Sequence, residues 1–218
     1  MQARIDKNFW LSGLVALAGT AILAVLYRFN YQTHEYNEYI VTNITLLLWL
    51  PILLIILVLK KEPSEFGITL GDKWGYKMVG LLFLVSLPAY IFAARLPQFQ
   101  NYYPIWKQAA YDPKFFRYYE LTYGMYLFCW EFFFRGFLLF GLKKYFNFWV
   151  AVFGQAVAFG IMHLGKPGAE VAASFGTGVV LGIVALRSRS FMPCFLIHWV
   201  SAATFDILVI LAGKGRLF

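Results

Sequence analysis

Long apolar runs dominate this sequence and restrict the folds that it can adopt. Several of them reach the roughly 20 residues that a helix needs to cross a bilayer. Of the 218 residues, 61% are hydrophobic and only 14% are charged, whereas a soluble domain carries about 25% charged residues. The alternating ten-residue segments typical of a membrane β-barrel are missing from the sequence. We therefore expect an all-α, polytopic membrane helical bundle with an internal cavity.

The apolar runs predict about seven transmembrane helices in a single domain that covers residues 1–218. Residues 1–114 hold three spans without a motif and an aromatic, polar connection that we expect to lie in the membrane interface. Residues 115–212 hold the remaining spans and the polar residues discussed below. The expected spans are Phe9–Tyr27, Tyr39–Leu59, Tyr76–Leu96, Phe116–Leu142, Phe148–His163, Glu170–Leu186 and Phe191–Ala212.

The net charge of +8 does not indicate a nucleic-acid partner. Basic residues stand beside apolar runs, as in Lys60-Lys61 and Lys143-Lys144, where such clusters set topology and contact anionic headgroups. The two cysteines, Cys129 and Cys194, lie inside apolar runs and imply no disulfide framework. We expect a multi-pass protein of a bacterial or archaeal cell membrane, with its N-terminus slightly favoured on the cytoplasmic side.

Two opposite charges lie in the middle of the fourth expected span. Glu131 and Arg135 are four residues apart, so they share a helix face and can pair. On insertion scales each charge at the bilayer centre costs about 2.5–3.5 kcal/mol, so their presence needs a reason. They are either a self-neutralising structural pair or part of a site for chemistry. Glu120 stands about three turns earlier on the same face, and we expect its carboxylate to reach the interface and water.

Two histidines extend this set. His163 closes the fifth expected span, and His198 lies well inside the seventh. Ionisable residues inside a membrane usually face an interior cavity and each other. In one chemistry Glu131 takes a proton from water while a histidine stabilises the oxyanion on a peptide carbonyl. In the other, the glutamate and the two histidines bind zinc with a fourth position open to water. The HExxH pattern of soluble zinc proteases is absent, which argues against zinc.

Three short motifs bring these residues together in sequence. They read Trp130-Glu131-x-x-x-Arg135, Phe159-x-x-x-His163 and His198-x-x-x-Ala202. In order and spacing, residues 115 to 210 resemble the CAAX-protease and bacteriocin-processing family of intramembrane endopeptidases, which includes the type II CAAX prenyl proteases. That family carries EExxxR, FxxxH and HxxxN on three separate helices. Here tryptophan stands where the family has its first glutamate, and alanine stands where it has asparagine.

The resemblance implies an intramembrane endopeptidase that cleaves a membrane-associated peptide or protein, with or without a lipid modification. Glu131, His163 and His198 are the expected catalytic residues, and Arg135 supports Glu131. We expect no cofactor; if zinc is present, the same three catalytic residues would bind it. Two other functions stay open. The chain could be a non-catalytic relative that binds a peptide or partner protein, or a proton-coupled transporter that uses the same ionisable residues as a relay.

One geometric tension accompanies this prediction. At 1.5 Å per residue, Glu131 and His198 lie about 18 and 14 Å along their helices from the basic pairs on the same side. His163, measured from Lys144, lies about 28 Å away. The three residues meet only if the fifth helix is tilted or if part of the segment 145–149 lies in the interface. The segment 165–168 would then form a break beside a cavity, because irregular backbone in a membrane must be buried in protein or line a cavity.

Overall fold

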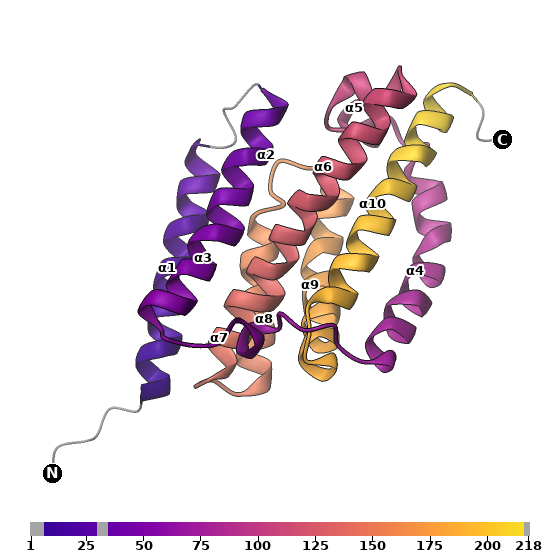
Figure 1. Ribbon diagram of the computed structural model, residues 1–218. Coiled ribbons are helices and arrows are strands. Elements are labelled where there is room, and N and C mark those ends of the chain that lie inside the picture. Colours follow the sequence, from indigo (N-terminus) through magenta and orange to yellow (C-terminus); the bar gives the residue numbers. More distant parts are fainter. Residues whose placement is uncertain (1–6, 30–34, 216–218) are drawn as a thin grey trace, which may run out of the picture.

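The computed structural model describes residues 7–29 and 35–215, and every regular element in these ranges is a helix (Figure 1). The expected all-α membrane bundle is therefore confirmed. One π-helical turn joins α2 to α3 and a second extends α3 to Val58, so these segments form one rod; a third joins α6 to α7. The α-helices are α1 Lys7–Phe29, α2 Tyr36–Ile44, α3 Leu50–Leu53, α4 Lys73–Ala93, α5 Pro97–Tyr102, α6 Pro113–Glu131, α7 Leu139–Lys143, α8 Phe148–Ile161, α9 Gly168–Ser188 and α10 Met192–Gly213.

Six helical segments of the described chain are long and apolar enough to cross a membrane. The continuous segment formed by α6 and α7, Pro113–Lys143, is the central one: 78% of its most apolar stretch is buried inside the protein. The corresponding buried share for α4 is 6%, so that helix lies at the edge of the bundle. Figure 1 shows α1, α2 and α3 on one side of the central helix and α10 and α4 on the other.

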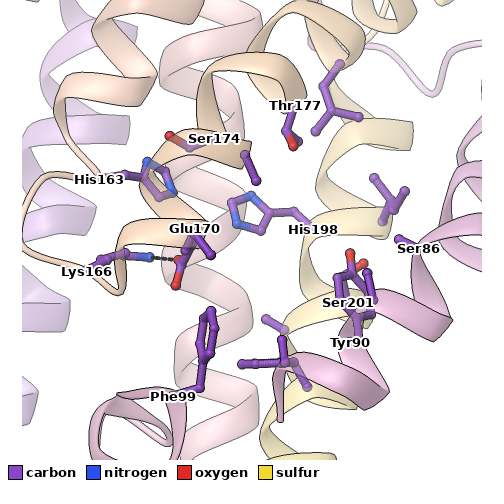
Figure 2. Close-up of a pocket in the computed structure, with 18 of the residues that line it drawn as sticks. Ser86, Tyr90, Phe99, His163, Lys166, Glu170, Ser174, Thr177, His198 and Ser201 are labelled. Atoms are coloured by element: carbon purple, nitrogen blue, oxygen red, sulfur yellow. Dashed lines mark hydrogen bonds and ion pairs between the residues drawn. The ribbon is translucent and has the colours of Figure 1, made fainter. Parts of the chain in front are cut away.

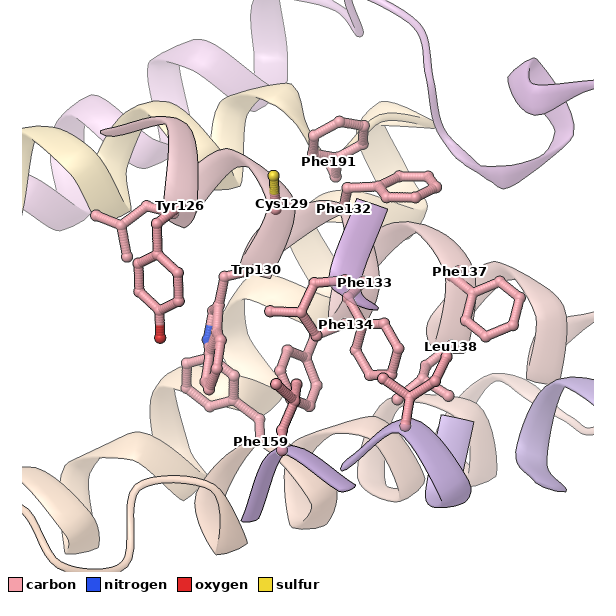
Figure 3. Close-up of a cluster of buried hydrophobic side chains, with 14 of the residues drawn as sticks. Tyr126, Cys129, Trp130, Phe132, Phe133, Phe134, Phe137, Leu138, Phe159 and Phe191 are labelled. Atoms are coloured by element: carbon pink, nitrogen blue, oxygen red, sulfur yellow. The ribbon is translucent and has the colours of Figure 1, made fainter. Parts of the chain in front are cut away.

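The core around the central helix is mainly aromatic. The side chains of Phe132, Phe133, Phe134 and Phe137 are completely buried, and Figure 3 shows them between the neighbouring helices together with Phe159 of α8. Phe132, Phe133 and Phe134 are consecutive and cannot all lie on one face of a helix, so this segment must be surrounded by protein. The core thus fixes the rotation of the helix at the point where Glu131 enters it.

The fifth expected span is shorter than the sequence suggested. Helix α8 has 14 residues, Phe148–Ile161, and its N-terminus is capped by Asn147, whose Oδ1 accepts a hydrogen bond from the Val150 N–H at 2.9 Å. The segment 145–147 precedes the helix and adds nothing to its rise. From Phe148 to Ile161 the helix rises about 20 Å, which is less than the 28 Å reckoned from Lys144. A turn over residues 162–167 then leads into α9 and contains Gly165 with φ +97°.

Helices α8 and α9 pack closely at two glycines of α9. A Cβ atom at Gly178 would lie 2.9 Å from the Cβ of Ala156, and one at Gly182 would lie 2.7 Å from Nε2 of Gln155. The Gln155 amide also donates a hydrogen bond of 2.7 Å to the Gly178 carbonyl oxygen. The spacing of Gly178 and Gly182, four residues apart on one helix face, therefore allows the two backbones to approach each other. This contact holds the α8–α9 turn, and His163 with it, against the bundle.

Candidate active site

A cavity of about 490 Å³ lies between α4, α9 and α10 and is partly covered by the segment that follows α4. His163 and His198 both line it, and Figure 2 shows their imidazoles pointing toward each other from the α8–α9 turn and from α10. Near Gly75 and Ser188, α4 and α9 are in contact, because a Cβ at Gly75 would lie 2.7 Å from the Ser188 Cβ. Further along the two helices Ala89 and Thr177 line the cavity and are still exposed, so the cavity is open on this side.

The structure brings three of the four expected site residues into one hydrogen-bonded group. Oε1 of Glu131 lies 2.6 Å from Nδ1 of His198 and 3.2 Å from Nη1 of Arg135. The side chains of Glu131 and Arg135 are completely buried, whereas His198 remains 23% exposed toward the cavity. Removing a charged group from water costs free energy unless it contacts an opposite charge. Here the carboxylate of Glu131 and the guanidinium of Arg135 contact each other. The carboxylate is thus fixed in position behind His198.

The guanidinium of Arg135 has a second contact besides the carboxylate. Its Cζ atom lies 3.8 Å from the centroid of the Phe159 ring, within the range of a cation–π interaction. The residue belongs to the π-helical turn Phe132–Leu138, which begins directly after Glu131. A π-helical turn contains more residues than an α-helical turn and is often found at functional sites. The wider turn still leaves the two charged groups in contact, so the pairing expected from their spacing is present.

His163 is held by a different contact. Its Nδ1 lies 2.8 Å from the carbonyl oxygen of Phe159, and its ring centroid lies 4.4 Å from that of Phe159. A carbonyl oxygen can only accept, so Nδ1 carries the proton and Nε2 of the neutral ring is an acceptor. The side chain of Phe159 is also near His198, with 6.2 Å between the ring centroids. The Phe159 ring therefore contacts both His163 and Arg135 and lies near His198.

Glu131 itself does not line the cavity in the part of the chain that the structure describes. Only His198 connects its carboxylate to the cavity, because Oε1 already binds two donors and Oε2 is buried without a partner among the described residues. Direct removal of a proton from a cavity water by Glu131, the role that the sequence suggested, has no support in this arrangement. His163 and His198 nevertheless line one cavity, and Glu131 is in contact with His198 behind its wall.

The two departures from the family motifs lie beside this group. Trp130 is 6% exposed and packs against Phe134 and His163, with ring centroids 5.0 and 5.9 Å away. Its indole nitrogen has no hydrogen-bond partner in the described ranges. Ala202 lines the cavity one turn after His198. Trp130 therefore packs an aromatic ring at the position where the family has a charged carboxylate. The small side chain of Ala202 leaves space at the cavity wall where the family has asparagine.

The sequence-based prediction for Glu120 is wrong. Both of its carboxylate oxygens are buried and have no hydrogen-bond partner in the described chain, because α10 packs over this part of α6. The indole nitrogen of Trp199 in α10 donates a hydrogen bond of 3.1 Å to the Glu120 carbonyl oxygen. Asp206, also on α10, is 1% exposed and accepts a hydrogen bond of 3.2 Å from Tyr119. It is the only acidic residue of its expected span, a signal that could have singled it out.

Three further polar residues of the cavity wall were not singled out from the sequence. Lys166 lies on the turn three residues after His163, Glu170 begins the expected sixth span, and Tyr103 comes from the aromatic connection after α4. Lys166 and Glu170 are four residues apart, a spacing that favours an ion pair and could have drawn attention to them in the sequence. Tyr103 is distant in sequence, so only the fold brings it to them.

The geometry does not favour the zinc site that the sequence left open as an alternative. Among the described residues no group of three or more histidine, cysteine, aspartate or glutamate side chains could hold a metal ion. In addition, Oε1 of Glu131 and Nδ1 of His198 are bonded to each other rather than directed at a common point. The expected set Glu131, His163 and His198 would need to rearrange before it could bind one ion.

One comparison with known proteins bears on this site. Residues 121–204 match the family model described as type II CAAX prenyl endopeptidase Rce1-like. This segment, less than half of the chain, is therefore similar to the CAAX protease-like family. The matched segment holds Glu131, Arg135, His163 and His198, and it excludes the first three long helices. This family implies an integral membrane protease that acts on a membrane-associated peptide or protein. No curated protein and no solved structure matches the chain.

Proposed function

We propose that this protein is an intramembrane endopeptidase in which His198 and Glu131 together activate a water molecule. The observation that carries this proposal is the 2.6 Å contact between Nδ1 of His198 and Oε1 of Glu131, at the wall of the cavity. A carboxylate that binds Nδ1 fixes the tautomer of an imidazole and stabilises the imidazolium that forms when Nε2 takes a proton. This arrangement makes His198, rather than Glu131, the group that contacts the water.

The reaction then follows from the tautomer. Nδ1–H of His198 donates to the carboxylate, so the lone pair of Nε2 is directed to the cavity. Nε2 takes one proton from water, and the hydroxide oxygen forms a bond to the carbonyl carbon of the peptide. When the C–N bond breaks, the same proton passes from Nε2 to the leaving nitrogen. Glu131 keeps its charge throughout and positions the ring.

His163 has a separate role in this proposal. Its Nδ1 proton is used by the Phe159 carbonyl oxygen, so Nε2 accepts hydrogen bonds. An acceptor at this position binds the second hydrogen of the attacking water and orients it between the two rings. The sequence suggested a histidine as the donor to the oxyanion, but a neutral His163 with this tautomer has no free N–H group to donate.

A second candidate function is a non-catalytic relative that binds a membrane peptide. It is favoured by the same burial that removes Glu131 from the cavity, and by the contact of Arg135 with the oxygen atom that also binds His198. In that case the buried group only stabilises the bundle, and the cavity serves as a binding site.

Cleavage of membrane-peptide libraries by the purified protein separates the two functions. We expect cleavage by the natural protein and loss of nearly all turnover in Glu131→Gln, His163→Ala and His198→Ala. The losses should not add in the double variants, because residues that act as one unit fail together. Glu120→Gln is the matched control: it removes another buried carboxylate of α6 outside this group and should retain turnover. Full activity of Glu131→Gln would overturn the assignment of the dyad.

A further inference from the structure

The end of the bundle where α4 begins and α9 ends carries basic side chains that the proposed chemistry does not use (Figure 1). Lys73 and Lys77 lie in the first two turns of α4. Arg187 lies in the last turn of α9, and Arg189 is the C-cap residue of that helix. All four residues are exposed. In the part of the chain that the structure describes, none of them lies within ion-pair distance of a carboxylate.

An aromatic contact holds two of these cations beside each other. The two helix ends touch, because a Cβ at Gly75 would lie 2.7 Å from the Ser188 Cβ. The Cζ atom of Arg187 lies 4.6 Å from the centroid of the Trp74 ring, within the range of a cation–π interaction. Lys77 comes three residues after Trp74, so it lies on the same side of α4, one turn further along. The side chains of Arg187 and Lys77 are therefore both next to Trp74.

The acidic residues at this end of the bundle are used elsewhere. Oδ1 of Asp72, the N-cap residue of α4, accepts a hydrogen bond of 2.8 Å from the Gly75 N–H. Oε2 of Glu65 lies 3.5 Å from Nζ of Lys61 and 2.7 Å from Nζ of Lys144. The basic residues near α7 are thus partly neutralised within the protein. Those of α4 and α9 have no such carboxylate partner among the described residues.

An apolar surface continues from these cations along both helices. Leu81 and Val85 follow Lys77 at intervals of four residues, so the three share one side of α4. Val180 lies two turns before Arg187 on the same side of α9. All three apolar side chains are exposed. Both helices are long and apolar enough to cross a membrane, so we expect these side chains to contact lipid chains, with the cations at the headgroup level.

We propose that Arg187 and Lys77 bind the phosphate of an anionic phospholipid, whose acyl chains lie on the adjoining apolar surfaces of α4 and α9. A guanidinium group binds phosphate oxygens through two parallel N–H groups, and an ammonium group adds a charge-assisted hydrogen bond. Basic sites between transmembrane helices at the headgroup level recognise anionic lipids in this way. A soluble phosphate would use only the cations, whereas a lipid also covers the apolar surface beside them. The inference does not depend on the proposed endopeptidase activity.

The test compares the binding of phosphatidylglycerol and phosphatidylcholine with the same acyl chains to the full-length protein. Native mass spectrometry of the protein in detergent with a mixture of both lipids gives the ratio of the two binding constants. The variants are Arg187→Gln, Lys77→Gln and the double variant that combines them. The matched control is Lys60→Gln/Lys143→Gln, which removes the same charge from two exposed lysines outside the site.

We expect the natural chain and the control to bind phosphatidylglycerol about 10- to 100-fold more tightly than phosphatidylcholine, the range for a charge-assisted hydrogen bond. The ratio should fall to about one in Arg187→Gln/Lys77→Gln and to intermediate values in the single variants. The substituted side chains are exposed, so the Tm of each variant should equal that of the natural chain. If the double variant does not fold, the single variants decide by the same ratio.

Three outcomes would overturn the inference. The first is a ratio near one for the natural chain, or a lipid preference that persists in the double variant. The second is an equal loss of preference in the control, because the general surface charge would then select the lipid. The third is displacement of phosphatidylglycerol by inorganic phosphate or glycerol phosphate, which would identify a soluble phosphate as the ligand. Retention of the lipid in an excess of either compound supports the phospholipid.

Discussion

The buried ion pair offers the sharpest test of how this bundle is stabilised. Replacing Arg135 by alanine removes the guanidinium that contacts Oε1 of Glu131 at 3.2 Å and the Phe159 ring at 3.8 Å. The carboxylate stays behind in a completely buried site, where His198 is its remaining partner. We therefore expect a large loss of stability from Arg135→Ala.

The magnitude can be worked from the geometry. Two unit charges 3.2 Å apart attract each other by about 5 kcal/mol at an effective dielectric constant of about 20. The hydrogen bond from His198 offsets part of the loss. Breaking one side of a buried pair generally costs about 3–5 kcal/mol, and we expect Arg135→Ala to fall in this range. For a chain of this length that corresponds to a fall in Tm of roughly 6–20 °C.

The assay is thermal unfolding of the purified protein in detergent, followed by tryptophan fluorescence. The decisive control is the double variant Glu131→Gln/Arg135→Met, which removes both charges and nearly conserves volume. Replacing a whole buried pair is often neutral, so the double variant should be more stable than Arg135→Ala. An unchanged Tm in Arg135→Ala, or a double variant as unstable as the single one, would refute this account of the pair.

Three further predictions concern other parts of the molecule. We expect substoichiometric zinc in the purified protein; one tightly bound zinc per chain, with activity lost on chelation and restored by zinc, would contradict this. Trp130→Glu restores the paired carboxylates of the family; if it cleaves library peptides that the natural chain leaves intact, the natural protein is the non-catalytic relative. The hydrogen bond from Lys144 lowers the pKa of Glu65 below the unfolded value of 4.5. Their 2.7 Å pair therefore stabilises the fold above pH 4.5, and this contribution is lost as the pH falls through the lower folded pKa. Glu65→Gln should lower Tm at pH 7 but much less at about pH 2, by an amount equivalent to at most about 1 kcal/mol because the pair is partly exposed.

The helical architecture could be predicted from the sequence because bilayer thickness and apolar composition leave few alternatives. The contact between Glu131 and Arg135 could also be predicted, since it needs only the spacing of one helix turn. The meeting of Glu131 with His198 was anticipated from the rule that intramembrane ionisable groups face each other, and their 2.6 Å contact agrees with it.

What the sequence could not give depends on how helices pack and end. Whether Glu131 or His198 faces the cavity is decided by the rotation of the central helix, which a fully buried aromatic segment and a π-helical turn fix together. The burial of Glu120 depends on α10, a helix about 80 residues away in sequence. The contact of Tyr103 with Glu170 likewise joins two segments 67 positions apart. No local pattern encodes such contacts.

The shortness of α8 has a consequence for where solvent reaches. Its 14 residues rise about 20 Å, well below the roughly 30 Å of a hydrocarbon layer, and the chain then continues as a turn that carries Lys166. An ammonium group and irregular backbone at this depth need hydration or protein partners on every side. We therefore expect the α8–α9 turn to be the place where water enters the nonpolar layer from one face. A hydrolytic water reaching the histidines by this path would cross only part of the membrane.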